Sequence, residues 1–285
     1  MDESIASISA VKSAISSGIA GVIGLHLEGP HLSIARKGAH DPALIRNMED
    51  EDCSQLCALA GELPSLLLTV APESVAPVQI TKLSNAGATV SLGHTDTDYK
   101  TAKAAVAAGA TCVTHLFNAM SQLKNRSPGL VGATLDSEVL FAGLIADGIH
   151  VDPAVIRIAV RAKRGAGRLF LVTDAVAPLG TNMKEFTLND RKILRNKGRL
   201  TLSDGTLAGA DLDMISAVRF MNSEIGLEVD EALRMASLYP AQLLKREKEI
   251  GSLVTGACAE FIHLDSQLQV GSVWRGSKCV RESKN

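Results

Sequence analysis

The sequence of 285 residues contains no apolar run long enough to span a bilayer, although 46% of its residues are hydrophobic. This absence argues against a membrane-spanning helix. The basic residues are scattered and the net charge is −2, so the chain lacks the clustered positive charge of a nucleic-acid-binding protein. No linker or low-complexity segment divides it. The hydrophobic content supports a sizeable core, and the length suits one large α/β barrel or two smaller domains.

Cysteine usage argues against a disulfide framework. The five cysteines are odd in number, and no pair has the Cys-x-x-Cys spacing of a metal or redox motif. We therefore expect reduced thiols and a cytoplasmic protein. Residues 1–4 are acidic and polar, unlike a signal peptide. The cysteines are Cys53, Cys57, Cys112, Cys258 and Cys279.

Two common enzyme motifs are also missing. No Gly-x-Gly-x-x-Gly opens a helix after a strand, so a dinucleotide-binding fold lacks its fingerprint, and no helical His-Glu-x-x-His is present. The sequence instead contains repeated strand–helix units with polar residues at the ends of the strands. This pattern predicts an α/β fold of the TIM-type (β/α) barrel class, because barrel sites are built at the strand ends. A doubly wound open sheet is the alternative.

Glu28 ends the first predicted strand. The apolar run 21–25 leads to this carboxylate, and Gly29-Pro30 then ends regular structure. A carboxylate at the tip of a buried strand is costly unless a cation compensates it. His26 shares a strand face with Glu28, and we regard it as a weaker candidate for a ligand.

Three later strands are predicted to end in the same way, at His94, His115 and Asp174. Two successive units have similar sequences. In each, a predicted helix ends at a glycine, and a short predicted strand follows and ends at a histidine. About one βα repeat separates the two units, so we expect both histidines on neighbouring strand ends. We predict that these three residues and Glu28 meet around one metal ion.

The residue types suit metal-assisted hydrolysis. One glutamate and two histidines are ligands for a divalent metal such as zinc, and three protein ligands leave a position open for water. Such a metal lowers the pKa of bound water toward neutrality. Asp174 could take the proton of that water and return it to a leaving amine. The alternatives are that Asp174 is a helix N-cap and that each histidine is a core residue bonded to backbone.

Three further polar residues, His40, Arg126 and His150, are expected in loops at the same face. Arginine binds phosphate or carboxylate bidentately, and histidine can donate to a carbonyl or hydroxyl oxygen. Solvated surface positions are the alternative for all three.

Seven short motifs occur in order between about residue 18 and the C-terminus. The chain that carries them resembles the N-acetylglucosamine-6-phosphate deacetylase family of the amidohydrolase superfamily. The motifs are His-Leu-Glu-Gly-Pro at 26–30, Lys-Gly-Ala-His at 37–40, Leu-Gly-His-Thr at 92–95, Thr-His-Leu-Phe-Asn-Ala-Met at 114–120, Ala-Asp-Gly-Ile-His-Val at 146–151, Leu-Val-Thr-Asp-Ala at 171–175 and Thr-Leu-Ala-Gly at 206–209.

The resemblance implies a function and a set of roles. It implies a homodimer with one Zn²⁺ per subunit, which hydrolyses the acetamide of N-acetylglucosamine 6-phosphate to acetate and glucosamine 6-phosphate in amino-sugar catabolism. The implied metal ligands are Glu28, His94 and His115, with Asp174 as the general base and acid. The implied substrate contacts are Ala39, His40 (polarising the acetamide carbonyl), Asn118, Ala119, Arg126 (facing the 6-phosphate, partly across a dimer interface), His150 (holding a sugar hydroxyl), Leu207, Ala208 and Gly209.

One departure from the family concerns the N-terminus. Family members carry a further N-terminal segment that supplies half of a small β-sandwich and the first barrel strands. Nothing in residues 1–18 matches the His-x-His pair often found on the first of those strands. We therefore expect a barrel that is incomplete at the N-terminus, with residues 1–255 as the barrel domain and residues 256–285 as C-terminal strands of the sandwich. Open strand edges would favour association.

Three alternative functions stay open. The first is deacetylation of the epimer, N-acetylgalactosamine 6-phosphate. The second is another amidohydrolase activity, dihydroorotase-like or aminoacylase-like, although the motifs of a two-metal site are missing. The third is a truncated, inactive relative that binds sugar phosphate or serves only as an interaction module.

Overall fold

Short apolar runs of the sequence form a parallel sheet. In a computed structural model of the chain, which describes residues 2–188, 190–276 and 278–282, a 6-stranded sheet has the order β1-β2-β3-β4-β5-β6. Neighbouring strands from β1 to β5 pair in parallel. Parallel strands in chain order need a crossover after each strand, which is the repeat of a TIM-type barrel. The strands are β1 (Leu25–Glu28), β2 (Leu66–Val70), β3 (Thr89–Leu92), β4 (Ala110–Val113), β5 (Phe141–Ile145) and β6 (Leu169–Val172).

The chain divides into two compact units, and β5 passes from one to the other. The first unit runs as far as Ala142 and includes Lys163–Gly167, and the second contains the remainder. Helices of the first unit are α1 (Asp2–Ser16), η1 (Ile34–Arg36, a 3-10 turn), α2 (Asp50–Glu62), α3 (Pro77–Asn85), α4 (Tyr99–Ala107) and α5 (Gly129–Asp136). Helices of the second are α6 (Pro153–Ala162), α7 (Met214–Ser223), α8 (Val229–Ala236) and α9 (Leu238–Leu243).

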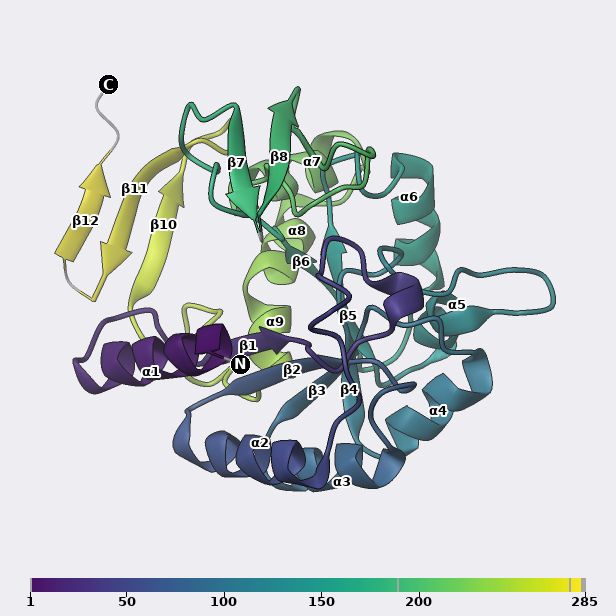
Figure 1. Cartoon of the computed structure of the whole chain (residues 1–285). Coiled ribbons are helices and arrows are strands. Elements are labelled where there is room, and N and C mark those ends of the chain that lie inside the picture. The colour runs from purple at the N-terminus through teal and green to yellow at the C-terminus, as the bar shows by residue number, and fades with distance from the viewer. Residues whose placement is uncertain (1, 189, 277, 283–285) are drawn as a thin grey trace. The chain divides into compact units, whose positions relative to one another are not determined.

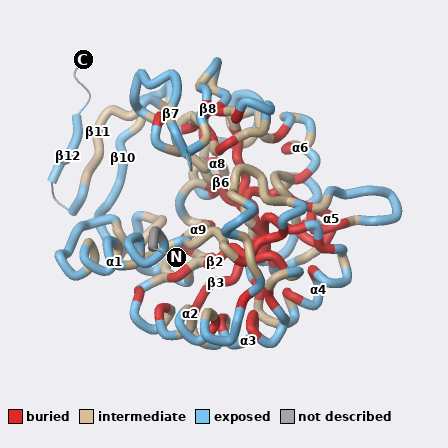
Figure 2. Tube along the Cα trace, in the orientation of Figure 1, coloured by how far each residue is buried: buried red, intermediate tan, exposed pale blue. Residues whose placement is uncertain are grey.

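The crossover helices of the first unit bury one side against its strands. Helix α3 packs on β3 and α4 packs on β4, and Figure 1 shows α2, α3 and α4 in a row beside β2, β3 and β4. Ile80 and Leu83 of α3 are fully buried, as is Leu92 of β3. Each such side chain contributes about 1.5–3 kcal/mol of transfer free energy. Figure 2 shows buried segments around the labels of β2 and β3.

Glycines end two of these helices as the sequence predicts. Gly87 follows α3 with a φ of +99°, and Gly109 follows α4 with a φ of +118°. These left-handed positions release the chain into β3 and β4, which carry the two predicted histidine ligands beyond their ends.

The second unit adds two small antiparallel sheets. The sequence predicts a β-hairpin insertion over 186–202, which the structure confirms and extends by a third strand, and the strands predicted in the tail are confirmed as a separate sheet. The predicted domain boundary at residue 255 stays a prediction. The strands are β7 (Glu185–Leu188), β8 (Arg191–Asn196), β9 (Arg199–Thr201), β10 (Glu260–Leu264), β11 (Val270–Arg275) and β12 (Lys278–Glu282).

One predicted helix break is wrong in position. The sequence suggests a helix over 229–244 that breaks at Pro240, but the break falls at Ser237, whose φ of −136° and ψ of −69° lie outside the helical region. Pro240 lies in the first turn of α9, where a missing backbone N–H costs nothing.

Among the described residues, no helix combines the length and the apolar character that crossing a membrane requires.

Candidate metal centre

The four predicted strand-end residues all lie where parallel strands finish. Glu28 is the last residue of β1, and His94, His115 and Asp174 each stand two positions after the end of β3, β4 and β6. The latter three have left-handed backbone, with φ values of 46°, 26° and 51°. Such backbone costs a residue other than glycine about 1–3 kcal/mol and is concentrated at functional sites. The strain marks these strand ends as a candidate site.

In the first unit, Glu28, His94 and His115 form a close triangle. The Nε2 atoms of the two histidines are 3.2 Å apart. Glu28 Oε1 lies 3.1 Å from His94 Nε2 and 3.0 Å from His115 Nε2. Ligand atoms of a tetrahedral zinc ion, each about 2 Å from the metal, are about 3.3 Å apart. The triangle therefore has nearly the dimensions of one face of a zinc coordination sphere.

The hydrogen bonding of His94 also fits a metal ligand. Its Nδ1 lies 2.9 Å from the carbonyl oxygen of Arg36, which can only accept, so Nδ1 carries a proton. In the neutral form of the ring Nε2 is then the atom that can bind a metal ion, and it lies beside the carboxylate oxygen of Glu28 and Nε2 of His115.

His40 belongs to the same cluster. Its Nε2 lies 3.8 Å from Glu28 Oε2, and its ring meets the His94 ring edge-on at a centroid distance of 4.7 Å. One ligand atom each of Glu28, His40 and His94 can approach a common ion. Burial by itself raises the pKa of the Glu28 carboxyl, but hydrogen bonds from His115, His40 and His94 outweigh burial and hold that pKa well below its usual range. The carboxylate is thus charged and available to a cation.

A network of charged residues holds the loop that carries His94. Glu73, which follows β2, accepts hydrogen bonds from Thr95 Oγ1 and, at 2.6 Å, from the backbone N–H of Asp96. The Asp96 carboxylate pairs with the Arg36 guanidinium at 2.7 Å. Because the Arg36 carbonyl orients the His94 ring, the network fixes both the backbone and the ring of this residue.

In the second unit, Asp174 lies against the loop 206–210. Its carbonyl oxygen accepts the N–H of Ala210 at 2.7 Å, and a Cβ on Gly209 would come within 3.0 Å of that oxygen. Gly209 has a φ of +70°, so glycine is needed here both for space and for backbone conformation. Ala208 is buried, and Leu207 forms a β-bridge with Thr201. The predicted contact loop is thus built directly beside the predicted base.

His150 is oriented by a carboxylate in the second unit. Its Nδ1 lies 2.6 Å from Asp147 Oδ2, and Asp147 Oδ1 accepts the N–H groups of Ile149 and His150, each at 2.8 Å. Burial raises the pKa of Asp147, but the bonds from His150 dominate and lower it. The charged carboxylate fixes the proton on Nδ1 and leaves Nε2 for another partner.

The remaining predicted contacts lie in loops of the first unit. Ala39 adjoins His40 after η1, and Asn118 Nδ2 donates to the carbonyl oxygen of His115 at 3.4 Å. The carbonyl oxygen of Ala119 accepts the N–H of Thr95 at 3.2 Å, which joins the loops after β3 and β4. Arg126 is exposed in the loop before α5.

Sequence reasoning missed the residues that hold the ligands in place. Glu73 is the last residue of the segment Ala-Pro-Glu that follows β2. It could have been found by the rule that selects Glu28, which looks for polar residues at the ends of predicted strands. Thr69 is a polar residue in an otherwise apolar strand, which is a second usable signal. The Arg36 contact is made by a carbonyl and has no signature in the sequence.

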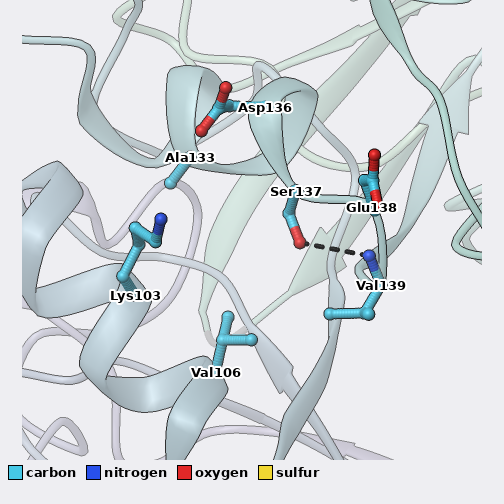
Figure 3. A pocket seen from close by; sticks show the side chains of 7 residues that line it. All are labelled: Lys103, Val106, Ala133, Asp136, Ser137, Glu138 and Val139. Carbon is cyan, nitrogen blue, oxygen red and sulfur yellow. Dashed lines mark hydrogen bonds between the residues drawn. The ribbon is translucent and has the colours of Figure 1, made fainter.

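A surface hollow beside α4 and α5 is separate from this cluster. Its Lys103 ammonium lies 5.5 Å from the centre of the Tyr99 ring, and the Tyr99 hydroxyl donates to Asp136. None of the predicted site residues lines it, so it carries no part of the predicted chemistry. The lining residues are Lys103, Val106, Ala133, Asp136, Ser137, Glu138 and Val139 (Figure 3).

Comparison with known proteins gives consistent matches. Residues 2–282 match the amidohydrolase family. The chain is 43% identical over 279 residues to N-acetylgalactosamine-6-phosphate deacetylase of Shewanella sp. (strain ANA-3), covering 98% of this chain and 70% of that protein. It is 40% identical over 269 residues to N-acetylglucosamine-6-phosphate deacetylase of Bos taurus, covering 92% of this chain and 65% of that protein.

A solved structure agrees with the predicted fold. The crystal structure of N-acetylglucosamine-6-phosphate deacetylase from Pasteurella multocida matches with a TM-score of 0.93 at 32% identity, over 99% of this chain and 74% of that chain. The TIM-type barrel predicted from the sequence is thereby confirmed, with a 6-stranded parallel sheet in this chain. Because both the family match and the relatives extend over nearly all of its residues, the chain belongs to the amidohydrolase family, metal-dependent hydrolases of amide bonds, and to its group of N-acetyl amino-sugar-6-phosphate deacetylases.

Proposed function

We propose that this chain hydrolyses the acetamide of N-acetylglucosamine 6-phosphate to acetate and glucosamine 6-phosphate in amino-sugar catabolism. The observation that carries the proposal is the triangle of Glu28, His94 and His115, in a chain whose relatives are named for this class of reaction. The second candidate substrate is N-acetylgalactosamine 6-phosphate, because the 43% identical Shewanella protein is named for that epimer.

We propose Glu28, His94 and His115 as the ligands of one Zn²⁺ per chain. The nitrogen and carboxylate donors and their separations of 3.0–3.2 Å support zinc. A zinc ion held there would supply Lewis acidity toward the acetamide carbonyl and toward water. His40, which lies beside Glu28, is suited to donate a hydrogen bond to the carbonyl oxygen as charge develops on it.

Asp174 is the proposed general base and acid. In the reaction a bond forms between the water oxygen and the carbonyl carbon, and the carbon–nitrogen bond of the amide breaks. The Asp174 carboxylate takes the proton of the water and returns it to the leaving nitrogen. Its place two residues after β6, in left-handed backbone like the two histidines, supports this role.

The proposed substrate contacts divide by chemistry. Arg126, an exposed guanidinium, is suited to the 6-phosphate, and His150 offers Nε2 to a sugar hydroxyl. The remaining proposed contacts are Ala39, Asn118, Ala119, Leu207, Ala208 and Gly209.

We also propose that the protein works as a cytoplasmic homodimer.

Acetate release by the purified chain tests this proposal. The chain should release acetate from N-acetylglucosamine 6-phosphate, lose the activity after dialysis against a chelator and regain it with zinc. The galactosamine epimer, assayed in parallel, identifies the better substrate by kcat/KM. A cooperatively folded chain that releases acetate from neither epimer, with or without zinc, would contradict the proposal and favour an inactive relative.

A further inference from the structure

A chain of hydrogen-bonded hydroxyls crosses the strands beneath the candidate metal centre. His26 Nε2 lies 2.7 Å from Thr69 Oγ1, Thr69 Oγ1 lies 2.6 Å from Thr114 Oγ1, and Thr114 Oγ1 lies 2.6 Å from Ser91 Oγ. These residues come from β1, β2, the end of β4 and β3. We call Thr69, Thr114 and Ser91 the hydroxyl chain. Together with His26 it joins side chains from all of the strands that carry the three proposed ligands.

The hydroxyl chain lies next to the ligands in the sheet register. Glu28 pairs with Thr69, and Thr69 pairs with Ser91, so the two hydroxyls continue the row that begins at the carboxylate. Thr114 directly precedes His115. A shift of these hydroxyl-bearing residues would therefore also move the backbone next to a proposed ligand.

Gly93, which precedes His94, packs on the hydroxyl chain. A Cβ added to Gly93 would lie 2.8 Å from Thr69 Cγ2 and 2.9 Å from Thr114 Cβ, closer than carbon atoms approach without strain. The two threonine side chains thus fill the space against the backbone that leads to His94. Glu28 is thus one pairing step from the hydroxyl chain, His115 is one residue from it, and His94 adjoins Gly93, which packs on it.

The hydroxyl chain lies beside an irregularity in the backbone pairing of β3 with β4. The pairing of β3 with β4 shifts register between Val90 and Ser91. The Ser91–Thr114 hydrogen bond joins the two strands just beyond that irregularity. Thr69 and Ser91 are only 1% exposed, so an unpaired hydroxyl there would cost about 1–3 kcal/mol. Each hydroxyl can donate one hydrogen bond and accept another, so the three side chains satisfy one another's polar groups.

We infer that the hydroxyl chain is a positioning element that fixes the spacing of Glu28, His94 and His115 for metal binding. This inference rests on the proposed metal site. The ligands come from different strands, and the backbone pairing of β3 with β4 is irregular just before them. Residues that orient metal ligands typically govern metal affinity by about 10–100-fold.

The test is a zinc affinity measured by competition with a chromophoric chelator. Thr114→Val keeps the side-chain shape and removes two hydrogen bonds of the chain, and it should weaken zinc binding about 10–100-fold. Thr114→Ser keeps the hydroxyl and should restore most of the affinity. The matched control is Thr134→Val in α5, where a fully buried hydroxyl donates to the Leu130 carbonyl oxygen at 2.7 Å. This control should lose comparable stability and keep the zinc affinity of the wild type.

The inference is overturned if Thr114→Val binds zinc as tightly as the wild type, or if Thr134→Val weakens binding equally. If Thr114→Val does not fold, Ser91→Ala, which removes only the terminal hydroxyl, should still weaken zinc binding, and unchanged affinity there overturns the inference. A wild-type chain that binds zinc but releases no acetate would contradict the proposed activity and leave this inference standing. A wild-type chain that binds no zinc would overturn both.

Discussion

At the scale of single residues, the strand ends combine backbone strain with unusual pairs of side chains. His94 and His115 adopt left-handed φ values, and their Nε2 atoms face each other and one carboxylate oxygen. The strained backbone raises the free energy of the folded state, so it persists only where the surrounding structure holds it. A cation bound by the two nitrogens and the carboxylate oxygen would add a favourable interaction at these strand ends.

Replacement of Asp174 by asparagine tests the proposed base at this scale. The amide keeps the size of the side chain but cannot accept the proton of the water, so kcat for acetate release should fall by about 10²–10⁴-fold. Zinc content should stay near that of the wild type, because Asp174 is not among the proposed ligands. Asp230→Asn, an exposed change in the first turn of α8, is the control and should keep full activity. Unimpaired turnover by Asp174→Asn would remove this residue from the mechanism.

The sequence identifies the three residues that the structure brings together, but it does not identify the groups that hold them in place. Glu28, His94 and His115 follow from the strand-end rule, because apolar runs and their polar ends are visible in one dimension. The Arg36 carbonyl and the Ser91–Thr114 hydrogen bond depend on where loops and neighbouring strands pass. Every residue has a backbone carbonyl, so a contact made by a carbonyl cannot be recognised from the residue type. Serine and threonine are too common in sequences to mark a site.

At the scale of elements, helix α2 begins with a capping arrangement reinforced by an ion pair. Asp52 accepts the N–H of Glu49 at 2.9 Å and also binds the Arg46 guanidinium through both oxygens, with Arg46 Nη2 at 2.5 Å from Oδ1. The hydrogen bond from Arg46 lowers the pKa of Asp52 to about 2. The Arg46–Asp52 ion pair therefore connects the loop that contains Arg46 to the first turn of α2.

Asp52 should therefore stabilise the fold in a pH-dependent manner. Because its pKa is lowered in the folded state, its contribution is fully present above the ordinary pKa near 3.8 and is lost as pH falls through about 2. Since Arg46 is partly exposed, we expect Asp52→Asn to cost about 1 kcal/mol at pH 7. The measurement is urea unfolding of both proteins between pH 7 and pH 2.

The control for this prediction is Asp50→Asn, an exposed change in the same helical turn. It should leave the free energy of unfolding within about 0.5 kcal/mol of the wild type. A difference between wild type and Asp52→Asn that stays constant down to pH 2 would contradict the proposed origin of the stabilisation.

Element order was predictable from the sequence, and the exact element ends were less so. The short apolar run at 65–70 predicts a strand, and it forms β2 (Leu66–Val70). The sequence predicts the break between α8 and α9 at Pro240, because proline is a visible helix breaker, but the break falls at Ser237, whose backbone turn has no comparable signal in the sequence. Helix α5 follows a long loop and has little periodicity to identify it.

At the scale of the whole molecule, the parallel sheet and the family match describe the same architecture. The 6-stranded sheet in chain order, the match to the amidohydrolase family over residues 2–282 and the TM-score of 0.93 to a deacetylase structure agree. The chain spans 70% of the Shewanella relative and 65% of the bovine relative. The proposed metal centre is the feature on which the proposed activity depends.

Titration of the metal-free chain with zinc, with bound zinc and acetate release measured on the same samples, tests the central claim most directly. We predict that activity rises in proportion to bound zinc and levels off at about one zinc per chain. Glu28→Gln, which removes the charge of the central ligand, should bind zinc at least about 10-fold more weakly and release little acetate. Full activity without zinc, or unchanged zinc binding by Glu28→Gln, would contradict the account.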